Sequence, residues 1–223
     1  MTDGQKPVSA VRVPVYICPS ERRDEVRVED GNPKHYPLNY AVNLGKWFVY
    51  DPSTEEGGSG AFYPNSRLGT RHFDDGLSKT MMAAEVRAWQ PHFRNAALPN
   101  DLKVPEKTTD VCAWGGAEFK QESGHTEWVD GRAHQTGFTT VFGPNSRVAC
   151  RRGDVEYDID WTNQQEGKSA TVKTFAVVTA RSYHTGVINV AMMDGSVEAV
   201  SDDIELKAWR AMSTRGGSDL RQQ

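Results

Sequence analysis

The chain has 223 residues, 37% of them hydrophobic and 25% charged, so it is long and apolar enough to form one sizeable core. Its 26 basic residues are scattered and outnumbered by 30 acidic ones, and the net charge of −4 argues against nucleic acid as a partner. No apolar run approaches the ~20 residues of a membrane helix, and residues 1–11 lack the apolar centre of a signal peptide, so the chain as given is expected to be soluble.

The first 60 residues predict strands separated by loops. Residues 11–18 are rich in β-branched side chains, which favours a strand that ends at Pro19 and Ser20. Residues 36–50 mix aromatic and aliphatic side chains without a helical period and are expected to pair with a sheet. The Gly-, Ser- and Glu-rich residues 51–60 predict a surface loop.

The next segments are less regular. Residues 80–86 leave a strand and a short helix open, and the high helix propensity of Ala, Met and Glu favours the helix. In the strand, one face would carry Thr80, Met82, Ala84 and Val86. Residues 91–111 predict a loop, with one helical turn as an alternative, and residues 111–116 predict no secure element.

Residues 153–161 show the clearest alternation in the chain and predict a half-buried strand. The acidic face of that strand would carry Asp154, Glu156, Asp158 and Asp160. A calcium site is the alternative to a solvated acidic face, but side chains on one face of a strand are ~6.6 Å apart, so at most two could reach one ion. The sequence therefore favours a solvated face that discourages edge-to-edge pairing.

Residues 182–200 predict a β-hairpin, and the β-rich run 171–180 leads into it. Asp194 and Gly195 are typical of a two-residue turn with positive φ, which would place Met193 opposite Ser196, Met192 opposite Val197, and Val190 opposite Ala199. After the hairpin, Asp202 or Asp203 could cap a helix that runs to about Met212. This gives an α+β fold, mainly antiparallel β, with long loops and a C-terminal helix.

Several short motifs occur in a fixed order along most of the chain. His184 is followed by nine residues and then by Asp194 and Gly195. The other motifs are residues 17–20 (ICPS), 75–80 (DGLSKT) with Glu85 beyond, 128–131 (WVDG), 144–146 (PNS) and 214–217 (TRGG). This order resembles the DUF1559 family, prepilin-like envelope proteins with an H-X9-DG domain that are known mainly from planctomycetes.

The resemblance implies the globular domain of a pseudopilin-like protein without its N-terminal anchor helix. The family pattern also favours a strand over a helix at residues 80–86, after the turn that precedes them, and we therefore expect a strand there. It divides the chain into a tail, residues 1–10, and a single domain, residues 11–223, with the short N-terminus interpreted as a truncation or an unusual short relative. The family motif residues to follow are Cys18, Pro19, Ser20, Asp75, Gly76, Ser78, Thr80, Glu85, His184, Asp194 and Gly195.

The sequence predicts no catalytic residues, no metal site and no cofactor. Its six histidines occur singly, and His125 and His134, nine residues apart, lack a metal-ligand spacing. His184 and Asp194 invite interpretation as a catalytic dyad, but ten steps of extended strand would separate them by ~33 Å. We therefore expect an architectural motif, with a partly buried His184 ring bound to a backbone carbonyl or a carboxylate, and Asp194 serving the turn.

Tryptophans and cysteines suggest two further features. Trp114 and Trp128 lie in loop-rich sequence and could contact a ligand such as a glycan, although core packing is the favoured interpretation for the six tryptophans as a group. If the envelope assignment implied by the family holds, Cys112 and Cys150 are the preferred disulfide pair, and three free thiols are the alternative.

The resemblance implies a non-enzymatic structural or assembly component of a bacterial cell envelope, related to type II secretion or type IV pili. Its partners would be other envelope or pseudopilus-like subunits or a second copy of the chain, its place would be extracytoplasmic, and membrane contact would need an N-terminal helix absent here. Two alternatives stay open: a glycan- or envelope-polymer-binding module, and a hydrolase that uses His184 with a carboxylate.

Overall fold

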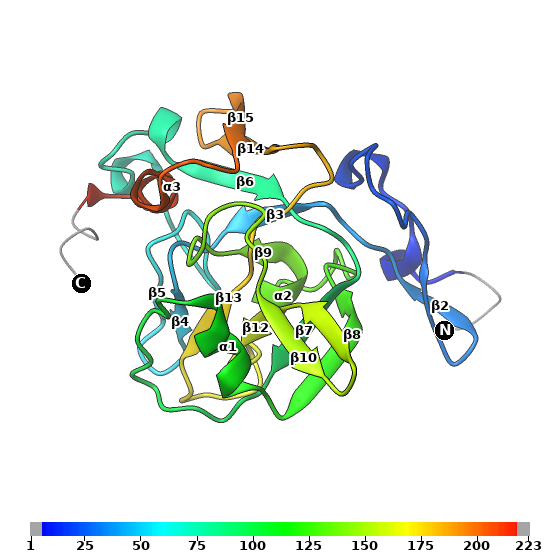
Figure 1. Ribbon diagram of the computed structural model, residues 1–223. Helices are drawn as coiled ribbons and strands as arrows, with labels where there is room; N and C mark the ends of the chain where they lie inside the picture. Colours follow the sequence, from blue (N-terminus) through cyan, green and yellow to red (C-terminus); the bar gives the residue numbers. More distant parts are fainter. Residues whose placement is uncertain (1–5, 218–223) are drawn as a thin grey trace.

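The computed structural model describes residues 6–217, and two β-sheets form its centre (Figure 1). The six-stranded sheet has the order β5-β4-β13-β12-β7-β8, and the five-stranded sheet has the order β15-β14-β6-β3-β9. Among the pairs of named strands, β12–β7 and β3–β9 are parallel and the others are antiparallel. The fold is therefore α+β with mainly antiparallel sheets, as the sequence predicted.

The six-stranded sheet is built from β4 (Phe48–Asp51), β5 (Glu56–Gly57), β7 (Gln90–Arg94), β8 (Glu118–Gly124), β12 (Asp160–Thr162) and β13 (Thr174–Val177). The five-stranded sheet is built from β3 (Tyr40–Asn43), β6 (Met81–Glu85), β9 (Gly137–Phe138), β14 (Val187–Met192) and β15 (Val197–Ser201). Two separate hairpins are β1 (Arg27–Glu29) with β2 (Asn32–His35), and β10 (Ala149–Arg152) with β11 (Val155–Asp158).

The helices are short. The α-helices are α1 (Thr108–Trp114), α2 (Ala133–Thr136) and α3 (Leu206–Met212), and the 3-10 helices are η1 (Val8–Ala10), η2 (Pro14–Tyr16), η3 (Thr70–His72) and η4 (Leu77–Lys79). Within residues 6–217, we find no helix with the length and apolar character needed to cross a membrane.

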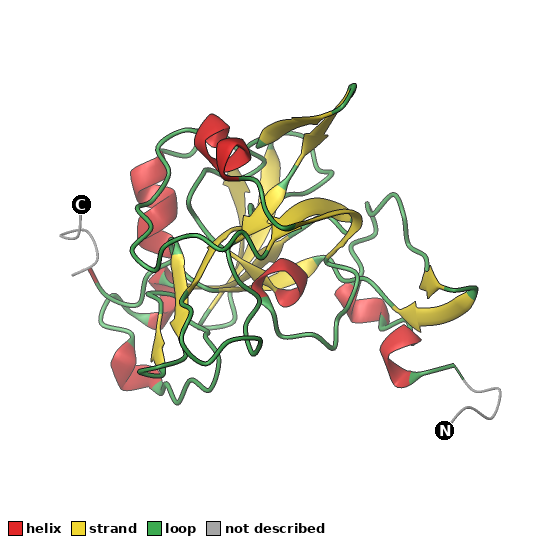
Figure 2. Ribbon diagram, turned by 90° about the horizontal axis from the view of Figure 1, so that it is seen from below, coloured by secondary structure: helices red, strands yellow, loops and turns green. Residues whose placement is uncertain are grey.

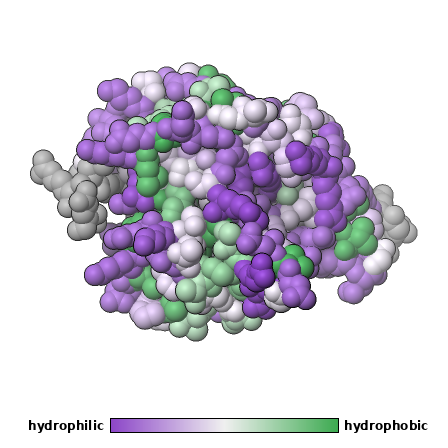
Figure 3. All heavy atoms as spheres, in the orientation of Figure 1, coloured by the Kyte–Doolittle hydropathy of each residue, from purple (hydrophilic) through white to green (hydrophobic). Residues whose placement is uncertain are grey.

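Two apolar clusters hold these elements together. One includes residues of both sheets and Trp209 of α3, whose ring stacks on Phe138 at 6.3 Å between centroids. The other joins the six-stranded sheet to α1 and the β10–β11 hairpin around Trp47, Trp161 and Phe175. The face of the molecule in Figure 3 is mostly hydrophilic, with apolar residues in small groups, as expected when the large side chains lie inside.

The N-terminal segment differs from the prediction. Residues 11–18 do not form a strand, because Pro14 lacks a backbone N–H and starts η2, in which Ile17 N donates to the Pro14 carbonyl at 3.2 Å. In the predicted tail, Lys6, Pro7 and Val8 are exposed and Ala10 is fully buried, and residues 1–5 lie outside the described part. The β1–β2 hairpin projects from the side of the molecule (Figures 1 and 2).

In the middle of the chain, the structure can be compared with the predictions for residues 80–86 and 91–111. The strand at 80–86 is confirmed as β6, and the helical alternative is wrong. The predicted loop is confirmed at residues 95–107 and wrong at residues 91–94, which belong to β7 (Gln90–Arg94), and α1, which begins at Thr108, agrees with the helical alternative. Pro91 suggested a loop, but the β7–β8 register shifts between Gln90 and His92, and such an irregularity accommodates a proline.

The alternating stretch at 153–161 forms two strands of different sheets instead of one. β11 pairs with β10, whereas β12 pairs with β7 and β13 in the six-stranded sheet. Glu156 is exposed, as expected for a solvated acidic face, but Asp160 is only 1% exposed. The prediction of a solvated face is therefore wrong for Asp160.

The hairpin of β14 and β15 is confirmed, but its predicted register is wrong by one residue. Ala191 pairs with Val197, and Met192 N donates to the Ser196 carbonyl at 2.8 Å. The turn contains three residues, 193–195, with Gly195 at φ 88°, so a longer loop that ends in a left-handed glycine replaces the two-residue turn.

The C-terminal helix is confirmed and starts later than expected, with Glu205 at its N-cap position. The two aspartates proposed as caps are engaged elsewhere: Asp202 accepts from Asn145 at 2.6 Å, and Asp203 accepts from the Ser201 hydroxyl.

Candidate functional site

Three family motif residues that are far apart in the sequence meet in one cluster. His184 Nε2 lies 3.1 Å from Glu85 Oε1 and 3.5 Å from Cys18 Sγ, and Cys18 Sγ lies 3.4 Å from the same Glu85 oxygen. Cys18 and Glu85 are 8% and 2% exposed, whereas the His184 side chain is 32% exposed. The cluster is therefore buried on two sides and open to solvent at the histidine.

Each member of the cluster is held by a different part of the fold. Cys18 follows η2, and its backbone N–H donates to Asn39 Oδ1 at 3.1 Å. Glu85 ends β6, and its second oxygen accepts from Asn189 of β14, at 2.7 Å from the backbone N–H and 3.2 Å from the side-chain amide. The cluster thus links the N-terminal segment to two neighbouring strands.

The loop that carries His184 is fixed by a second family motif. His184 N donates to Ser182 Oγ at 3.1 Å, and Ser182 N donates to Asn145 Oδ1 at 2.8 Å. Asn145 belongs to the motif at 144–146 and takes a positive φ of 55°, a conformation that asparagine adopts more readily than most residues. Motifs some 40 residues apart therefore act on the same loop.

Burial governs the chemistry of the cluster. The apolar surroundings raise the pKa of the Cys18 thiol, and the Glu85 carboxylate raises it further. Burial raises the pKa of the Tyr40 hydroxyl to about 12, and the neighbouring Cys18 and Glu85 add to this shift. A thiol whose pKa is raised is a poor nucleophile, so the cluster is not poised for thiol-based hydrolysis.

His184 and Asp194 serve opposite ends of β14. Asp194 Oδ1 accepts from the Ser196 backbone N–H at 2.9 Å and from its hydroxyl at 2.7 Å, and these bonds lower the pKa of Asp194. The geometry agrees with an architectural motif, with one difference: β14 begins at Val187, so His184 lies in the preceding loop and not on one continuous strand with Asp194.

We expect His184→Ala to lower the free energy of unfolding of the metal-free protein by about 1–3 kcal/mol, because Glu85 would lose a buried partner. Asp194→Ala removes bonds at a solvent-exposed turn, so its loss should be smaller. Urea denaturation of both variants measures the difference, and unchanged midpoints for both would contradict the assignment.

Two other motifs meet at the opposite end of β6. Asp75 Oδ1 accepts from Gly217 N at 3.0 Å, and Thr80 Oγ1 donates to the Thr214 carbonyl at 3.3 Å. Gly76 takes a positive φ of 95° at the start of η4, and Ser78 lines a cavity of about 640 Å³ between η4 and α3. The DGLSKT and TRGG motifs therefore bind the start of β6 to the end of α3.

The model of one family, described as a protein of unknown function (DUF1559), matches residues 1–207. The chain belongs to the DUF1559 family. No curated protein and no solved structure matches it. The family description assigns no activity.

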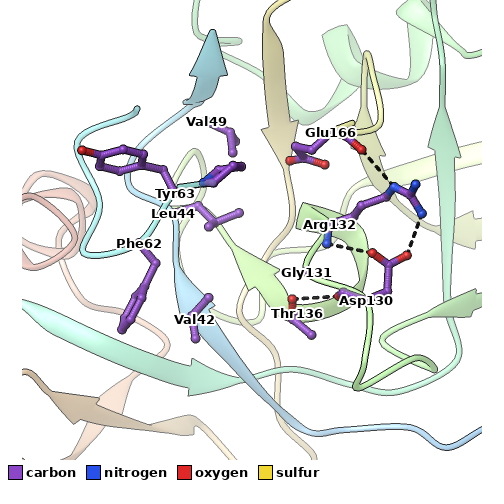
Figure 4. Close-up of a pocket in the computed structure, with 11 residues that line it drawn as sticks. Val42, Leu44, Val49, Phe62, Tyr63, Asp130, Gly131, Arg132, Thr136 and Glu166 are labelled. Atoms are coloured by element: carbon purple, nitrogen blue, oxygen red, sulfur yellow. Dashed lines mark hydrogen bonds and ion pairs between the residues drawn. The ribbon is translucent and has the colours of Figure 1, made fainter. Parts of the chain in front are cut away.

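A pocket of about 450 Å³ in this DUF1559 protein lies beside the WVDG motif at 128–131 (Figure 4). One wall is apolar and includes Val42, Leu44 and Phe62, and the other carries Asp130, Arg132 and Glu166. Arg132 donates to the Glu166 carbonyl at 3.1 Å and to Asp130 Oδ2 at 2.9 Å. Arg132 is therefore hydrogen-bonded to residues of the same polar wall of the pocket.

Burial raises the pKa of Glu166 to about 7, and the nearby Asp130 carboxylate adds to the effect. Below the ordinary value of 4.5 the carboxyl is protonated in both states, and between 4.5 and about 7 the folded state retains a proton that the unfolded state releases. Stability should therefore fall as the pH rises through this window.

Glu166→Gln should remove that dependence. Because the side chain is only partly buried, we expect the variant to be about 2–3 kcal/mol more stable than the parent at pH ~8 and equally stable at pH ~4. Urea unfolding across the pH range measures the gain. Asp154→Asn, at an exposed carboxylate, is the control, and a gain that does not change with pH would contradict the assignment.

The sequence analysis missed a buried charge network behind β12. Arg181 Nη1 donates to Asp160 Oδ1 at 2.5 Å, and Arg181 Nη2 donates to Asp158 Oδ1 at 3.0 Å. The Arg181 and Asp160 side chains are 2% and 1% exposed, and His125 Nε2 lies 3.6 Å from Asp160 Oδ2. The sequence signal for this network was the run of alternating carboxylates at residues 154–160. An acidic residue inside a strand can be buried when an arginine on a neighbouring segment pairs with it.

His92, His134, Trp114 and Trp128 make contacts within the fold. The rings of His134 and His92 lie 4.7 Å apart between centroids, tilted by 32°, and burial lowers the pKa of both rings. Trp114 lies 4.9 Å from Trp161, and Trp128 Nε1 donates to the Val11 carbonyl at 3.1 Å. Trp114 and Trp128 are both half-buried, and their contact with a ligand stays a prediction.

The structure contains a disulfide between Cys112 of α1 and Cys150 of β10, with Cα atoms 5.3 Å apart, and the thiol of Cys18 is free. This is the pair that the sequence analysis preferred. The bond fastens α1 to the β10–β11 hairpin next to the tryptophan-rich cluster.

Proposed function

We propose that this DUF1559 protein is a non-enzymatic structural or assembly component of a bacterial cell envelope, pseudopilin-like and related to type II secretion or type IV pili. The observation that carries the proposal is the use of the family motifs, several of which join segments that are distant in the sequence. Cys18 and His184 reach Glu85, Asp75 reaches Gly217, and Asn145 holds Ser182. Because these motif residues make contacts within the protein, they favour a structural role over a catalytic one.

The disulfide supports an extracytoplasmic place for the protein. Disulfides persist in oxidising compartments such as the bacterial periplasm and the cell surface and are rare in the reducing cytosol. Cys112 and Cys150 form one here.

One observation favours hydrolysis as the second candidate. His184 contacts the buried carboxylate of Glu85 at 3.1 Å, which is the pairing that orients a general base. However, the second oxygen of Glu85 accepts two bonds from Asn189, and the raised pKa of Cys18 keeps the neighbouring thiol protonated. The pair therefore fits a structural role better.

The outer edge of the five-stranded sheet is a candidate contact surface for a partner. β15 is the terminal strand, Val197 is 70% exposed, and within residues 6–217 no strand pairs with its outer side. An exposed edge strand can add a strand from another chain. We propose that other envelope subunits, or a second copy of this chain, pair there.

Site-specific photo-crosslinking in the native host tests this proposal. A photoreactive residue at position 197 should yield adducts with envelope proteins or with a second copy, whereas one at Val155, which is 50% exposed on the separate β10–β11 hairpin, should not. Adducts with cytoplasmic proteins alone would contradict the proposal. Saturable hydrolysis by the purified chain, abolished by His184→Ala, would favour the second candidate instead.

A further inference from the structure

We infer that Cys18, Glu85 and His184 form a binding site for one divalent transition-metal ion, with Zn²⁺ the best fit. The three donor atoms, a sulfur, a carboxylate oxygen and an imidazole nitrogen, converge from three parts of the fold. The sequence predicted no metal site because 67 and 99 residues separate these ligands, far from any motif spacing.

The separations of the donor atoms match a tetrahedral zinc site. With Zn–S, Zn–N and Zn–O bonds of about 2.3, 2.05 and 2.1 Å, tetrahedral angles place the sulfur about 3.6 Å from the other two donors and the nitrogen about 3.4 Å from the oxygen. The structure has S···N at 3.5 Å, S···O at 3.4 Å and N···O at 3.1 Å. All three differences are about 0.3 Å or less, so an ion fits with small side-chain shifts.

Hydrogen bonds alone satisfy this arrangement less well. With a neutral imidazole and a neutral thiol, His184 Nε2–H and the Cys18 S–H can both donate to Glu85, and Nε2 then has no second hydrogen for its contact with the sulfur. If Nε2 instead accepts from the thiol, its contact with the Glu85 carboxylate joins two acceptors. Either assignment leaves one of the three contacts unsatisfied, whereas an ion replaces the protons and uses all three.

The surroundings of the cluster resemble the support that metal ligands receive. Glu85 is oriented by two bonds from Asn189, and the backbone of Cys18 is held by Asn39. Such outer contacts fix the direction of a ligand and strengthen metal binding. The half-exposed His184 gives an ion a path from solvent and leaves room for a water molecule as the fourth ligand.

The chemistry of the donors selects the class of ion. Thiolate and imidazole suit zinc and similar transition metals, whereas Ca²⁺ and Mg²⁺ require oxygen ligands, of which this cluster offers one carboxylate. The bound ion would hold the segment after η2 against β6 and the loop before β14. This inference does not depend on the proposed envelope role, because the site would exist in any compartment that supplies zinc.

Metal binding by the full chain, stripped with a chelator and dialysed, tests the inference. We expect about one equivalent of zinc per chain, measured by elemental analysis, and a higher unfolding temperature with zinc than without. Cobalt in place of zinc should give a near-ultraviolet thiolate-to-metal charge-transfer band.

Variants of the ligands should separate this site from adventitious binding. Cys18→Ser, Glu85→Gln and His184→Gln should each weaken zinc at least about 100-fold, a loss larger than that from an outer-shell partner, and Cys18→Ser should abolish the cobalt band. Asp194→Ala, at the far end of the same hairpin, should bind like the parent. A folded parent protein that retains no zinc and shows no cobalt band would overturn the inference, as would zinc retained equally by all three ligand variants.

Discussion

Replacing Arg181 with methionine is expected to lower the free energy of unfolding by about 3–5 kcal/mol, the cost of leaving a buried charge without its partner. The guanidinium binds two carboxylates and two carbonyl oxygens, those of Thr179 and Ile159. Without it, the Asp160 carboxylate stays buried and is left only with His125 and the backbone N–H of Thr179. Urea denaturation of parent and variant measures the loss.

Two further variants sharpen this test. Arg151→Met, at an exposed position on β10, should change stability by less than about 0.5 kcal/mol. Arg181→Met combined with Asp160→Leu should recover part of the loss, because the unpaired charge is gone. A loss below about 1 kcal/mol for Arg181→Met would mean that Asp160 is not held as a buried anion.

Reducing the Cys112–Cys150 disulfide is expected to cost about 4 kcal/mol of stability. The bond closes a loop across a sequence separation of 38, and the chain-entropy relation for a loop of this length gives that magnitude. Urea unfolding with and without a thiol reductant measures the cost. The double variant Cys112→Ser with Cys150→Ser should match the reduced parent and not respond to reductant, and equal midpoints for the oxidised and reduced parent would contradict the expectation.

Local patterns were sufficient to predict much of the fold. The hairpin at β14–β15 followed from an apolar run, an Asp-Gly turn and a second apolar run. The strand at β6 followed instead from the family resemblance, because local propensity favoured a helix there. The hairpin register could not be derived in the same way, because it depends on whether the turn takes two or three residues. β7 was missed because Pro91 is typical of a loop when strand partners are unknown.

The residues of the Cys18–Glu85–His184 cluster could be selected from the sequence, but their arrangement in space could not. Sequence analysis selected Cys18, Glu85 and His184 as separate motif residues, and nothing in their spacing indicates that β6 and the loop before β14 bring them together. Asp160 was assigned to a solvated face, since alternation alone cannot reveal that Arg181 approaches from a distant segment. Contacts over long sequence separations are set by sheet topology, which single-strand patterns do not encode.

We propose that this DUF1559 protein works outside the cytoplasm, stabilised by a disulfide and by its motif contacts. Alkylation of free thiols in intact native cells, followed by mass spectrometry of the protein, tests this claim most directly. The account predicts that Cys112 and Cys150 are recovered as a linked pair and that Cys18 is not disulfide-bonded. Recovery of Cys112 and Cys150 as alkylated, unlinked thiols from cells quenched at once in acid would contradict it.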